Sequence, residues 1–285
     1  MILVTGATGT IGRHVMRLLQ QGGHRARAMT RARPTGADTV QADFDDPGSL
    51  RRAVAGAERV FLLTAPPTPA AAHDHALLAA AREAGVRSVV KVSAIGTGER
   101  FGTVTVGGWH AEAEEAVRAG GMGWTVLRPS SFASNCLPWA EAVRTGQPVA
   151  DLTGNGEQGV IDPRDVAAVA VAALTDPDRH AGRTWTLTGP ELLTVTDQAR
   201  VLREVIGMPV ATVDVAPDDA RRRLAASGMP RAAVEAVVTG AAWARAGHNA
   251  VLTADVAEVL GRPPATFREW ARRNREVFRR PGKAA

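Results

Sequence analysis

The chain has 285 residues, with 34 basic and 29 acidic side chains for a net charge of +5, a single Cys and no Tyr. This length predicts one large domain or two coupled lobes, and 45% hydrophobic with 22% charged residues excludes a disordered chain, a collagen or a small disulfide scaffold. One Cys cannot close an intrachain disulfide, and no signal-type segment precedes the first expected strand, so we expect a cytoplasmic protein. No uncharged apolar run approaches the roughly 20 residues of a membrane span, so we expect no membrane partner.

Apolar, β-rich runs alternate with helical patterns through the first two-thirds of the chain. The expected strands are Ile2–Thr5, Ala26–Thr30, Thr39–Ala42, Arg59–Thr64, Ser88–Ser93, Trp124–Arg128 and Thr184–Leu187. The expected helices between them are Gly12–Gln21, Pro47–Ala55, Ala70–Ala84, His110–Ala119 and Arg164–Leu174. This alternation predicts βαβ units with right-handed crossovers. The fold class is therefore α/β, a doubly wound, mostly parallel Rossmann sheet that we assign to residues 1–190.

The last hundred residues have a different pattern. Helical stretches are expected at Val195–Ile206, Asp218–Ala226, Arg231–Ala246 and Thr266–Phe278, separated by Gly and Pro signals, with one short extra strand at Ala211–Val215. We interpret residues 191–285 as a smaller, mostly helical substrate lobe that covers the carboxyl edge of the sheet, and we expect residues 132–159 to contribute to it.

The positive charge does not indicate nucleic-acid binding. The arginines are spread along the chain, and their densest group falls in the expected last helix. Aromatic residues are few and do not interleave with a basic stretch, as a single-strand binder requires. We therefore expect a solvated helix face and no nucleic-acid partner.

A glycine-rich turn follows the first expected strand. Gly6, Gly9 and Gly12 form a G-x-x-G-x-x-G pattern between that strand and an amphipathic helix, which is the context a dinucleotide-binding turn requires. Gly6 allows the tight turn, Gly9 lets the backbone approach a pyrophosphate, and Gly12 lets the helix pack on the sheet. The helix N-terminus then offers N–H groups to phosphate. The alternative is a Gly-rich turn without a ligand. The expected contacts of this turn are Gly6, Thr8, Gly9, Thr10, Ile11 and Gly12.

Two arginines follow the second expected strand. An NAD site needs a carboxylate here for the ribose 2′-hydroxyl, but this chain has Arg31 and Arg33 and no acid before Asp38. Guanidinium groups suit a 2′-phosphate in charge and geometry, so we expect NADP(H) as the cofactor. Purely structural roles remain the alternative, more so for Arg33.

Other candidate contacts follow the carboxyl ends of the later strands, where ligands bind in this architecture. Asp43 and Phe44 are expected to flank the adenine, and the turn after the sixth strand is expected to border the nicotinamide. For each of these residues, ordinary turn chemistry is the alternative. The further cofactor candidates are Thr64, Ala65, Pro66, Ser93, His110, Pro129, Ser131 and Phe132.

These motifs together resemble the NmrA-like atypical short-chain dehydrogenase/reductases. The resemblance rests on TGATGTIG, the Thr-Arg after the second strand, Asp43, VVKVSAIG, WHAEAEEAV and GWTVLRPSSFASN, and it extends through LTGPELLTV and LGRPPATFREWA. That group includes NADPH-dependent quinone-reductase-like proteins and is related to the isoflavone reductases. The resemblance implies a Rossmann domain with a small C-terminal substrate lobe.

The chain departs from the wider superfamily at the catalytic pair. Short-chain dehydrogenases ordinarily use Tyr-x-x-x-Lys, which a chain without Tyr cannot supply. Alignment on the Glu-rich helix puts Val106 at the Tyr position and His110 at the Lys position. Glu114 follows one helical turn later, where it could raise the pKa of His110 or fix its tautomer.

His110 and Ser93 are the catalytic candidates. An imidazole that titrates near neutral pH would make His110 a proton donor; the alternatives are binding of ribose or substrate, or a structural role. Ser93 either polarises a substrate oxygen or simply ends a strand. Substrate-pocket walls are expected from Trp109, Phe132, Asn135 and Trp139, although a Trp is more often part of the core.

A metal site is not expected. His73-Asp74-His75 resembles a ligand pair, but on a helix residues i and i+2 point about 200° apart and cannot share an ion. Cys136 has no evident base and is expected to behave as a small hydrophobe.

Two functions fit these features. The first is an NADPH-dependent reductase that transfers hydride to a small conjugated acceptor such as a quinone, an enone or an iminium, which accepts hydride without a strong Tyr acid. The second is a non-catalytic NADP(H)-sensing regulator of the NmrA type that binds a protein partner. Epimerase- or cyclase-like use of the cofactor is a further alternative. Substrate identity and a homo-oligomeric state are left open by the sequence.

Overall fold

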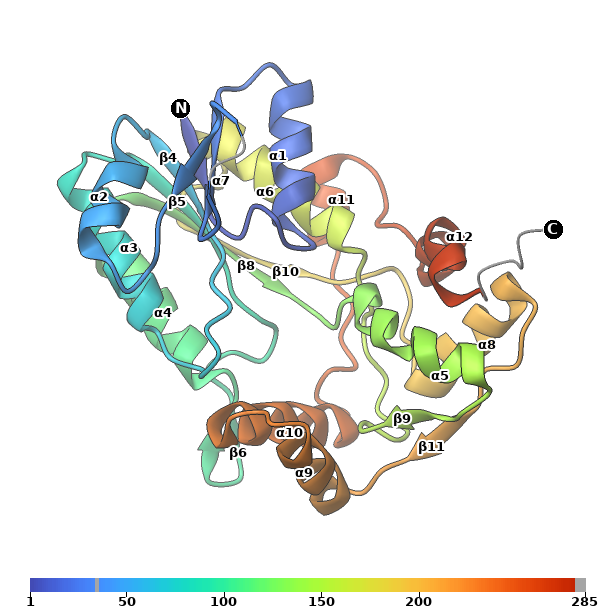
Figure 1. The fold of residues 1–285 in the computed structure, drawn as a ribbon. Helices are drawn as coiled ribbons and strands as arrows, with labels where there is room; N and C mark the ends of the chain where they lie inside the picture. Colours follow the sequence, from blue (N-terminus) through green and yellow to red (C-terminus); the bar gives the residue numbers. More distant parts are fainter. Residues whose placement is uncertain (34–35, 280–285) are drawn as a thin grey trace. The chain divides into compact units, whose positions relative to one another are not determined.

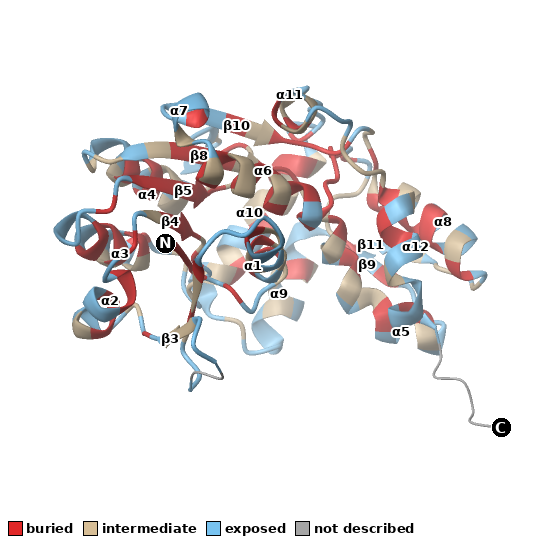
Figure 2. Cartoon of the chain, turned by 90° about the horizontal axis from the view of Figure 1, so that it is seen from above, coloured by how far each residue is buried: buried red, intermediate tan, exposed pale blue. Residues whose placement is uncertain are grey.

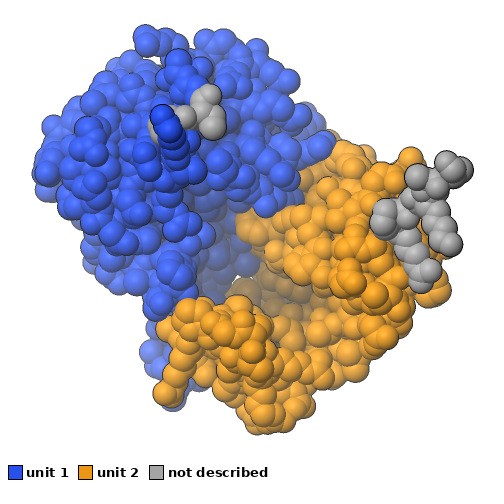
Figure 3. All heavy atoms as spheres, viewed as in Figure 1, with its two compact units in different colours: residues 1–129, 163–187, 255–262 blue, residues 130–162, 188–254, 263–285 orange. Residues whose placement is uncertain are grey.

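The computed structural model describes residues 1–33 and 36–279, which form two compact units. The first unit comprises residues 1–129, 163–187 and 255–262, and the second comprises residues 130–162, 188–254 and 263–285, of which the described part ends at 279 (Figure 3). The expected boundary near residue 190 assigned residues 255–262 to the C-terminal lobe, whereas the structure places them in the first unit.

A parallel sheet forms the centre of the first unit (Figure 1). In the described part of the chain its seven strands run in the order β10-β8-β5-β4-β1-β2-β3, and every neighbouring pair is parallel. The order reverses direction between β1 and β4, which is the point where doubly wound sheets bind ligands. The strands are β1 (Ile2–Val4), β2 (Ala26–Thr30), β3 (Thr39–Gln41), β4 (Arg59–Leu62), β5 (Ser88–Val92), β8 (Gly123–Pro129) and β10 (Arg183–Leu187).

Helices cover both faces of this sheet. Helix α1 packs on α6, and α6 packs on β4, β5 and β8, while α2, α3 and α4 lie side by side on the opposite face (Figure 1). The covered strands are correspondingly apolar, and Figure 2 shows β4, β5 and β8 as mostly buried. The helices are α1 (Gly12–Gln21), α2 (Pro47–Val54), α3 (Ala72–Glu83), α4 (Gly108–Ala119), α6 (Pro163–Thr175), α7 (Pro177–His180) and α11 (Asp255–Leu260).

A short antiparallel hairpin, β6 (Arg100–Phe101) and β7 (Val104–Thr105), lies between β5 and α4. Gly107 follows it with φ +57°, and a Cβ at this position would lie 2.9 Å from Oγ1 of Thr97. The chain can therefore enter α4 along this path only with glycine at position 107.

The second unit is mainly helical. Its larger apolar cluster joins α5, α8 and α12 around Phe267, Trp270 and Leu202, and a smaller cluster joins α9 and α10 around Val234. Capping boxes begin α8 and α12, with Thr194 paired to Asp197 and Thr266 paired to Glu269. The elements are η1 (Ala133–Trp139), α5 (Ala140–Thr145), β9 (Val149–Asp151), α8 (Val195–Ile206), β11 (Thr212–Asp214), α9 (Pro217–Ala226), α10 (Arg231–Arg245) and α12 (Phe267–Phe278).

The Rossmann-like α/β class and the expected strands are confirmed, with ends that shift by up to two residues. The expected extra strand is β11, which pairs in parallel with β9, a strand that the sequence analysis did not anticipate. Among the described residues, no helix is long and apolar enough to cross a membrane.

Candidate cofactor and active site

The glycine turn after β1 is built by close backbone contacts. Gly6 has φ +60°, and a Cβ at position 12 would lie only 2.1 Å from the carbonyl oxygen of Gly6. Only glycine therefore allows α1 to start against this turn. The hydroxyl of Thr5 contacts the carbonyl oxygens of Phe61 and Leu63 at 3.1 and 2.9 Å, which ties the end of β1 to the end of β4.

Free N–H groups of this turn fit a diphosphate. The N–H of Gly9 donates to Gly6 at 2.9 Å, but within the described chain the N–H groups of Thr8, Thr10 and Ile11 have no acceptor. No acidic side chain occupies the first turn of α1, so the partial positive charge of the helix N-terminus is not neutralised. The residues present therefore suit the phosphates of a dinucleotide.

Arg31 and Arg33 follow β2 as exposed side chains. The amide of Gln41 donates to the carbonyl oxygen of Arg31 at 3.0 Å and fixes the backbone there. Neither guanidinium group has an ion-pair or hydrogen-bond partner among the residues that the structure describes. Both are therefore available to an external anion.

Asp43 and Phe44 follow β3. The Asp43 carboxylate is exposed and accepts a hydrogen bond from the N–H of Asp45 at 3.1 Å. The ring of Phe44 stacks on His73 with centroids 4.9 Å apart, and His73 lies 3.4 Å from the Asp45 carboxylate. This turn is thus held against α3 by an aromatic pair.

The segment after β4 contains Thr64, Ala65 and Pro66. The buried hydroxyl of Thr64 donates to Asp74 Oδ2 at 2.8 Å. Since this proton is already used, the segment is left with its backbone and the side chains of Ala65 and Pro66 to contact a ligand.

Ser93, just after β5, lies in a buried polar cluster. Its hydroxyl donates to Glu114 Oε1 at 2.6 Å, and Arg128 donates to both oxygens of Glu114 at 2.9 and 2.7 Å. Arg118 adds a further contact to Glu114 at 2.7 Å. Burial by itself raises the pKa of Glu114, but the hydrogen bonds from Arg128, Ser93 and Arg118 outweigh it and bring the pKa below its ordinary value. In this arrangement a substrate oxygen competes with Glu114 for the Ser93 proton.

His110 lies in the first turn of α4, with its ring stacked on Trp109 at a centroid distance of 3.6 Å. Burial, and secondarily the charge of Lys91, lower the pKa of His110 to about 3, against a weaker opposing effect of Glu114. The expectation that His110 titrates near neutral pH is therefore wrong, although Glu114 does raise its pKa as expected, by less than burial and Lys91 lower it. The oxygens of Glu114 are occupied by Ser93, Arg118 and Arg128, and Nδ1 of His110 is buried without a partner in the described structure. Glu114 does not fix the tautomer of the imidazole.

Lys91 and Asp74 complete this region and were not anticipated as a pair. Nζ of Lys91, on β5, lies 2.8 Å from Oδ1 of Asp74, on α3, and both side chains are 0% exposed. Burial lowers the pKa of Lys91 although Asp74 opposes this shift. The sequence did contain a signal, because a charged residue interrupts the apolar strand VVKV, but it does not identify the partner.

The remaining candidates lie at the end of β8 and in the second unit. Pro129 ends β8, and Ser131 follows in the second unit, where its hydroxyl accepts from the amide of Asn135 at 3.4 Å. Phe132 is half-buried and pairs with Ile161 in an isolated parallel bridge. Trp139 packs against the larger apolar cluster of the second unit, which is the core role that the sequence analysis kept as its alternative. Asn135 is exposed.

Cys136 is buried in the second unit, and burial raises the pKa of its thiol well above the ordinary value. Its Sγ donates to Gln198 at 3.3 Å. Both observations agree with its expected behaviour as a small hydrophobe.

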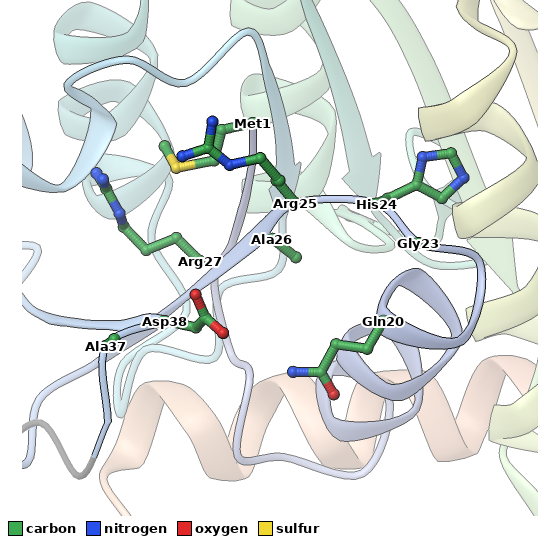
Figure 4. Close-up of a pocket in the computed structure, with 9 residues that line it drawn as sticks. All are labelled: Met1, Gln20, Gly23, His24, Arg25, Ala26, Arg27, Ala37 and Asp38. Atoms are coloured by element: carbon green, nitrogen blue, oxygen red, sulfur yellow. The ribbon is translucent and has the colours of Figure 1, made fainter.

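A cavity of about 380 Å³ lies at the opposite edge of the sheet from the glycine turn (Figure 4). It is surrounded by the start of β2, the end of α1 and the segment before β3, and its lining contains none of the expected cofactor contacts. Dinucleotides bind at the carboxyl ends of parallel strands, so this cavity is not the cofactor site. The lining residues are Met1, Gln20, Gly23, His24, Arg25, Ala26, Arg27, Ala37 and Asp38.

No group of three or more metal-ligating side chains occurs in the described residues. His73 and His75 lie on α3 as expected, and they face different carboxylates, those of Asp45 and Glu112. The two imidazoles do not share a site.

The sequence profile of a family described as NAD(P)H-binding matches residues 6–177 of this chain. The chain belongs to this NAD(P)H-binding family. A relative from Streptomyces griseus, a (4-alkanoyl-5-oxo-2,5-dihydrofuran-3-yl)methyl phosphate reductase, is 40% identical over 98% of this chain and 99% of its own length. An NAD(P)H azoreductase from Xenophilus azovorans is 34% identical over 98% of this chain and 99% of its own length.

Solved structures share this fold. The quinone oxidoreductase QOR2 of Escherichia coli, in complex with NADPH, is similar with a TM-score of 0.82 at 23% identity, over 95% of this chain and 98% of its own. Within the family the chain is a member of the NmrA-like atypical short-chain dehydrogenase/reductases and is an oxidoreductase.

Proposed function

We propose that this oxidoreductase is an NADPH-dependent reductase of a small conjugated acceptor, in which a double bond is polarised by a carbonyl group. The observation that carries the proposal is the buried imidazole of His110, whose Nδ1 has no partner among the described residues and whose pKa is lowered by burial, in a chain without Tyr. Such a site has a hydrogen-bond donor but no strong acid. It suits an acceptor that takes hydride at carbon while its charge spreads over a conjugated system.

The cofactor is expected at the glycine turn, with its phosphates on the free N–H groups of Thr8, Thr10 and Ile11. When bound, NADPH supplies the hydride. The unpaired guanidinium groups of Arg31 and Arg33 hold the 2′-phosphate and favour NADPH over NADH. Asp43 and the backbone after β4 contact the adenosine and the remaining sugar. Pro66, Pro129, Ser131 and Phe132 are expected as further cofactor contacts.

His110 is expected to act as a neutral donor. Its imidazole N–H donates a hydrogen bond to the acceptor's carbonyl oxygen, and this stabilises the negative charge that develops there. An uncharged imidazole gives up its proton much less readily than an imidazolium, so the proton that completes the product comes from water. Ser93 positions the site through Glu114 rather than by donating to the substrate.

The relative from Streptomyces griseus supports this choice of acceptor. Its name describes a 5-oxo-2,5-dihydrofuran ring with a 4-alkanoyl group, in which the ring double bond is conjugated to two carbonyl groups. The azoreductase and the quinone oxidoreductase likewise carry the names of reductases of conjugated systems. A butenolide or another enone is therefore the first acceptor class to test.

The test is the loss of NADPH absorbance with a panel of butenolides, enones, quinones, azo compounds, cyclic imines and simple ketones, with NADH in parallel. We expect NADPH-selective turnover of conjugated acceptors and none of isolated ketones. His110→Leu should lower kcat by about 10²-fold, the scale of one removed donor at a developing oxyanion, and His110→Gln should recover part of the loss because its amide also donates.

Turnover of isolated ketones at a similar rate would contradict the proposed acceptor class. Tight NADP(H) binding without turnover of any acceptor would instead support the alternative, a dinucleotide-sensing regulator with a protein partner. Relative affinities for NADP⁺ and NADPH then decide whether the chain responds to the redox state.

A further inference from the structure

Lys91 is a buried lysine beside Trp109, a residue of the expected active site. It is the only lysine among the described residues, it lies on β5 between Val90 and Val92, and its side chain is fully buried. Its Nζ is at ion-pair distance from Asp74, yet it has no well-formed hydrogen bond among the described residues. Two or more of its N–H groups are therefore without an acceptor.

The pair contacts two segments of the expected active site. Nζ of Lys91 lies 5.6 Å from the ring centroid of Trp109, within the range of a cation–π contact, and Trp109 stacks on His110. On the other side, Asp74 accepts the hydrogen bond of Thr64, at the end of β4. A single buried pair thus connects the segment after β4 with the first turn of α4.

Stability does not explain why the chain has this pair. The desolvation of two buried charges opposes their attraction, so apolar residues of similar volume often leave stability unchanged or improved. The position of the pair is more informative, because each charge is directed at a different segment that is expected to contact cofactor or substrate.

We propose that the Lys91–Asp74 pair is a positioning device for the active site: Lys91 holds the Trp109–His110 ring pair, and Asp74 holds Thr64. This inference rests on the proposed function, in which His110 acts as a neutral donor. Lys91 does not contact the reacting atoms and is therefore a positioning residue rather than a catalytic one.

The charge of Lys91 has a second effect on His110. The charged groups that act on the imidazole are Lys91 on β5 and Glu114 on its own helix. Glu114 is in turn neutralised by Arg118 on α4 and by Arg128 on β8, and Lys91 is balanced by Asp74 on α3. Lys91 disfavours the imidazolium and Glu114 favours it, so removal of the Lys91 charge raises the pKa of His110.

The test uses the double variant Lys91→Met, Asp74→Asn in the full chain. Both buried charges are then removed together, and Asn still accepts the hydrogen bond of Thr64. The matched control is Arg262→Met, Asp165→Asn, which removes an ion pair of 2.7 Å with one fully buried partner at α6, among residues with no assigned part in binding or catalysis. The measurements are the NMR titration of the His110 ring between pH 3 and 8, the NADPH dissociation constant and the pH profile of NADPH oxidation.

The expected results differ sharply between the two variants. In the Lys91→Met, Asp74→Asn protein the pKa of His110 rises by about one unit, a tenfold gain in proton affinity, and stays below its ordinary value because burial remains. The rate of NADPH oxidation then decreases at acidic pH, where the wild-type rate does not. In this variant kcat falls more than the affinity for NADPH. The control variant keeps the wild-type titration and profile.

An unchanged titration of His110 together with an unchanged pH profile in the double variant would overturn the proposal. If that variant does not fold, Lys91→Gln, Asp74→Asn is the second test, since it also removes both charges, its two amides can hydrogen-bond to each other, and the same rise in the pKa of His110 is expected. The NMR titration needs no turnover. A shifted titration in a protein that reduces no acceptor would therefore contradict the proposed function and leave the positioning role in place.

Discussion

Glu114 shows how much of this site depends on one buried side chain. Its two oxygens accept hydrogen bonds from Ser93, Arg118 and Arg128, which belong to different parts of the first unit. The carboxylate stays ionised because these donors compensate for its burial. It therefore connects the end of β5, helix α4 and β8 next to the expected active site.

The substitution Glu114→Gln should destabilise the fold. It leaves Arg128 and the buried hydroxyl of Ser93 without a charged acceptor. Loss of one partner of a buried pair lowers the free energy of unfolding by about 3 kcal/mol. Urea unfolding measures this change. Glu115→Gln is the control, since Glu115 is exposed on the same helix, and it should change the free energy by less than about 0.5 kcal/mol. Equal effects of the two substitutions would contradict this account of the cluster.

Arg31 is the residue on which cofactor preference is expected to depend. Replacement of its free guanidinium by a carboxylate in Arg31→Asp removes a charged hydrogen bond to the 2′-phosphate and adds repulsion. We expect the ratio of NADPH to NADH affinity to fall by about 10- to 100-fold, as measured by fluorescence titration of both cofactors. Arg82→Asp, at the exposed end of α3, controls for net charge and should leave the ratio unchanged. An unaltered ratio in Arg31→Asp would remove the basis for an NADPH preference at this position.

At the scale of elements, the unit β1–turn–α1 is held together by backbone contact rather than by side chains. A methyl group at position 12 would lie 2.1 Å from a carbonyl oxygen, a distance that no rotamer change relieves. A single methyl group at position 12 therefore prevents α1 from packing against the turn, even if the rest of the helix is unchanged.

We therefore expect Gly12→Ala to lower the free energy of unfolding by about 3 kcal/mol or more and to abolish binding of NADPH. Gly240→Ala is the matched control, because Gly240 lies inside helix α10 with nothing within 4 Å of its added Cβ. That substitution should be neutral or stabilise by up to about 1 kcal/mol. Thermal unfolding and calorimetric titration with NADPH test both. A Gly12→Ala protein with normal affinity would show that the turn is not the phosphate site.

The sheet and its glycine turn could be predicted because their signals are local. Apolar runs of the right length, with helical patterns between them, indicate parallel strands whatever the rest of the chain does. Strand β9 could not be predicted in the same way, since Val149–Asp151 is a strand only through its pairing with β11, about sixty residues later. The return of α11 to the first unit likewise depends on its packing against α6 and β10.

Side-chain chemistry in the site was harder to predict than side-chain position. The spacing of His110 and Glu114 correctly indicated one helix face, but the partners of Glu114 come from outside that helix. The pKa of His110 depends on burial and on Lys91, neither of which can be read from local sequence. Sequence therefore identified candidate residues, while their protonation required the tertiary structure.

At the scale of the whole molecule, buried neutral histidines make stability depend on pH. His110 has a pKa of about 3 in the folded chain, and burial together with Arg179 and Arg183 lowers the pKa of His180. Both lie below the value of about 6.5 expected in the unfolded chain. The unfolded chain therefore binds protons that the folded chain does not, and the corresponding stability is complete above about pH 6.5 and is lost as the pH falls toward the folded pKa.

This predicts that the free energy of unfolding falls as the pH is lowered from 7 to 5, a window above the titration of most carboxylates. Near pH 5 His110 contributes a slope of about 1.4 kcal/mol per pH unit, and His180 contributes in the same direction. His110→Asn should reduce the slope by about that amount, whereas His24→Asn, which changes an exposed side chain, should leave it as it is. Urea unfolding at several pH values measures the slopes. A slope that is the same in His110→Asn and in wild type would mean that His110 is charged in the folded protein, and the neutral-donor role would then fail.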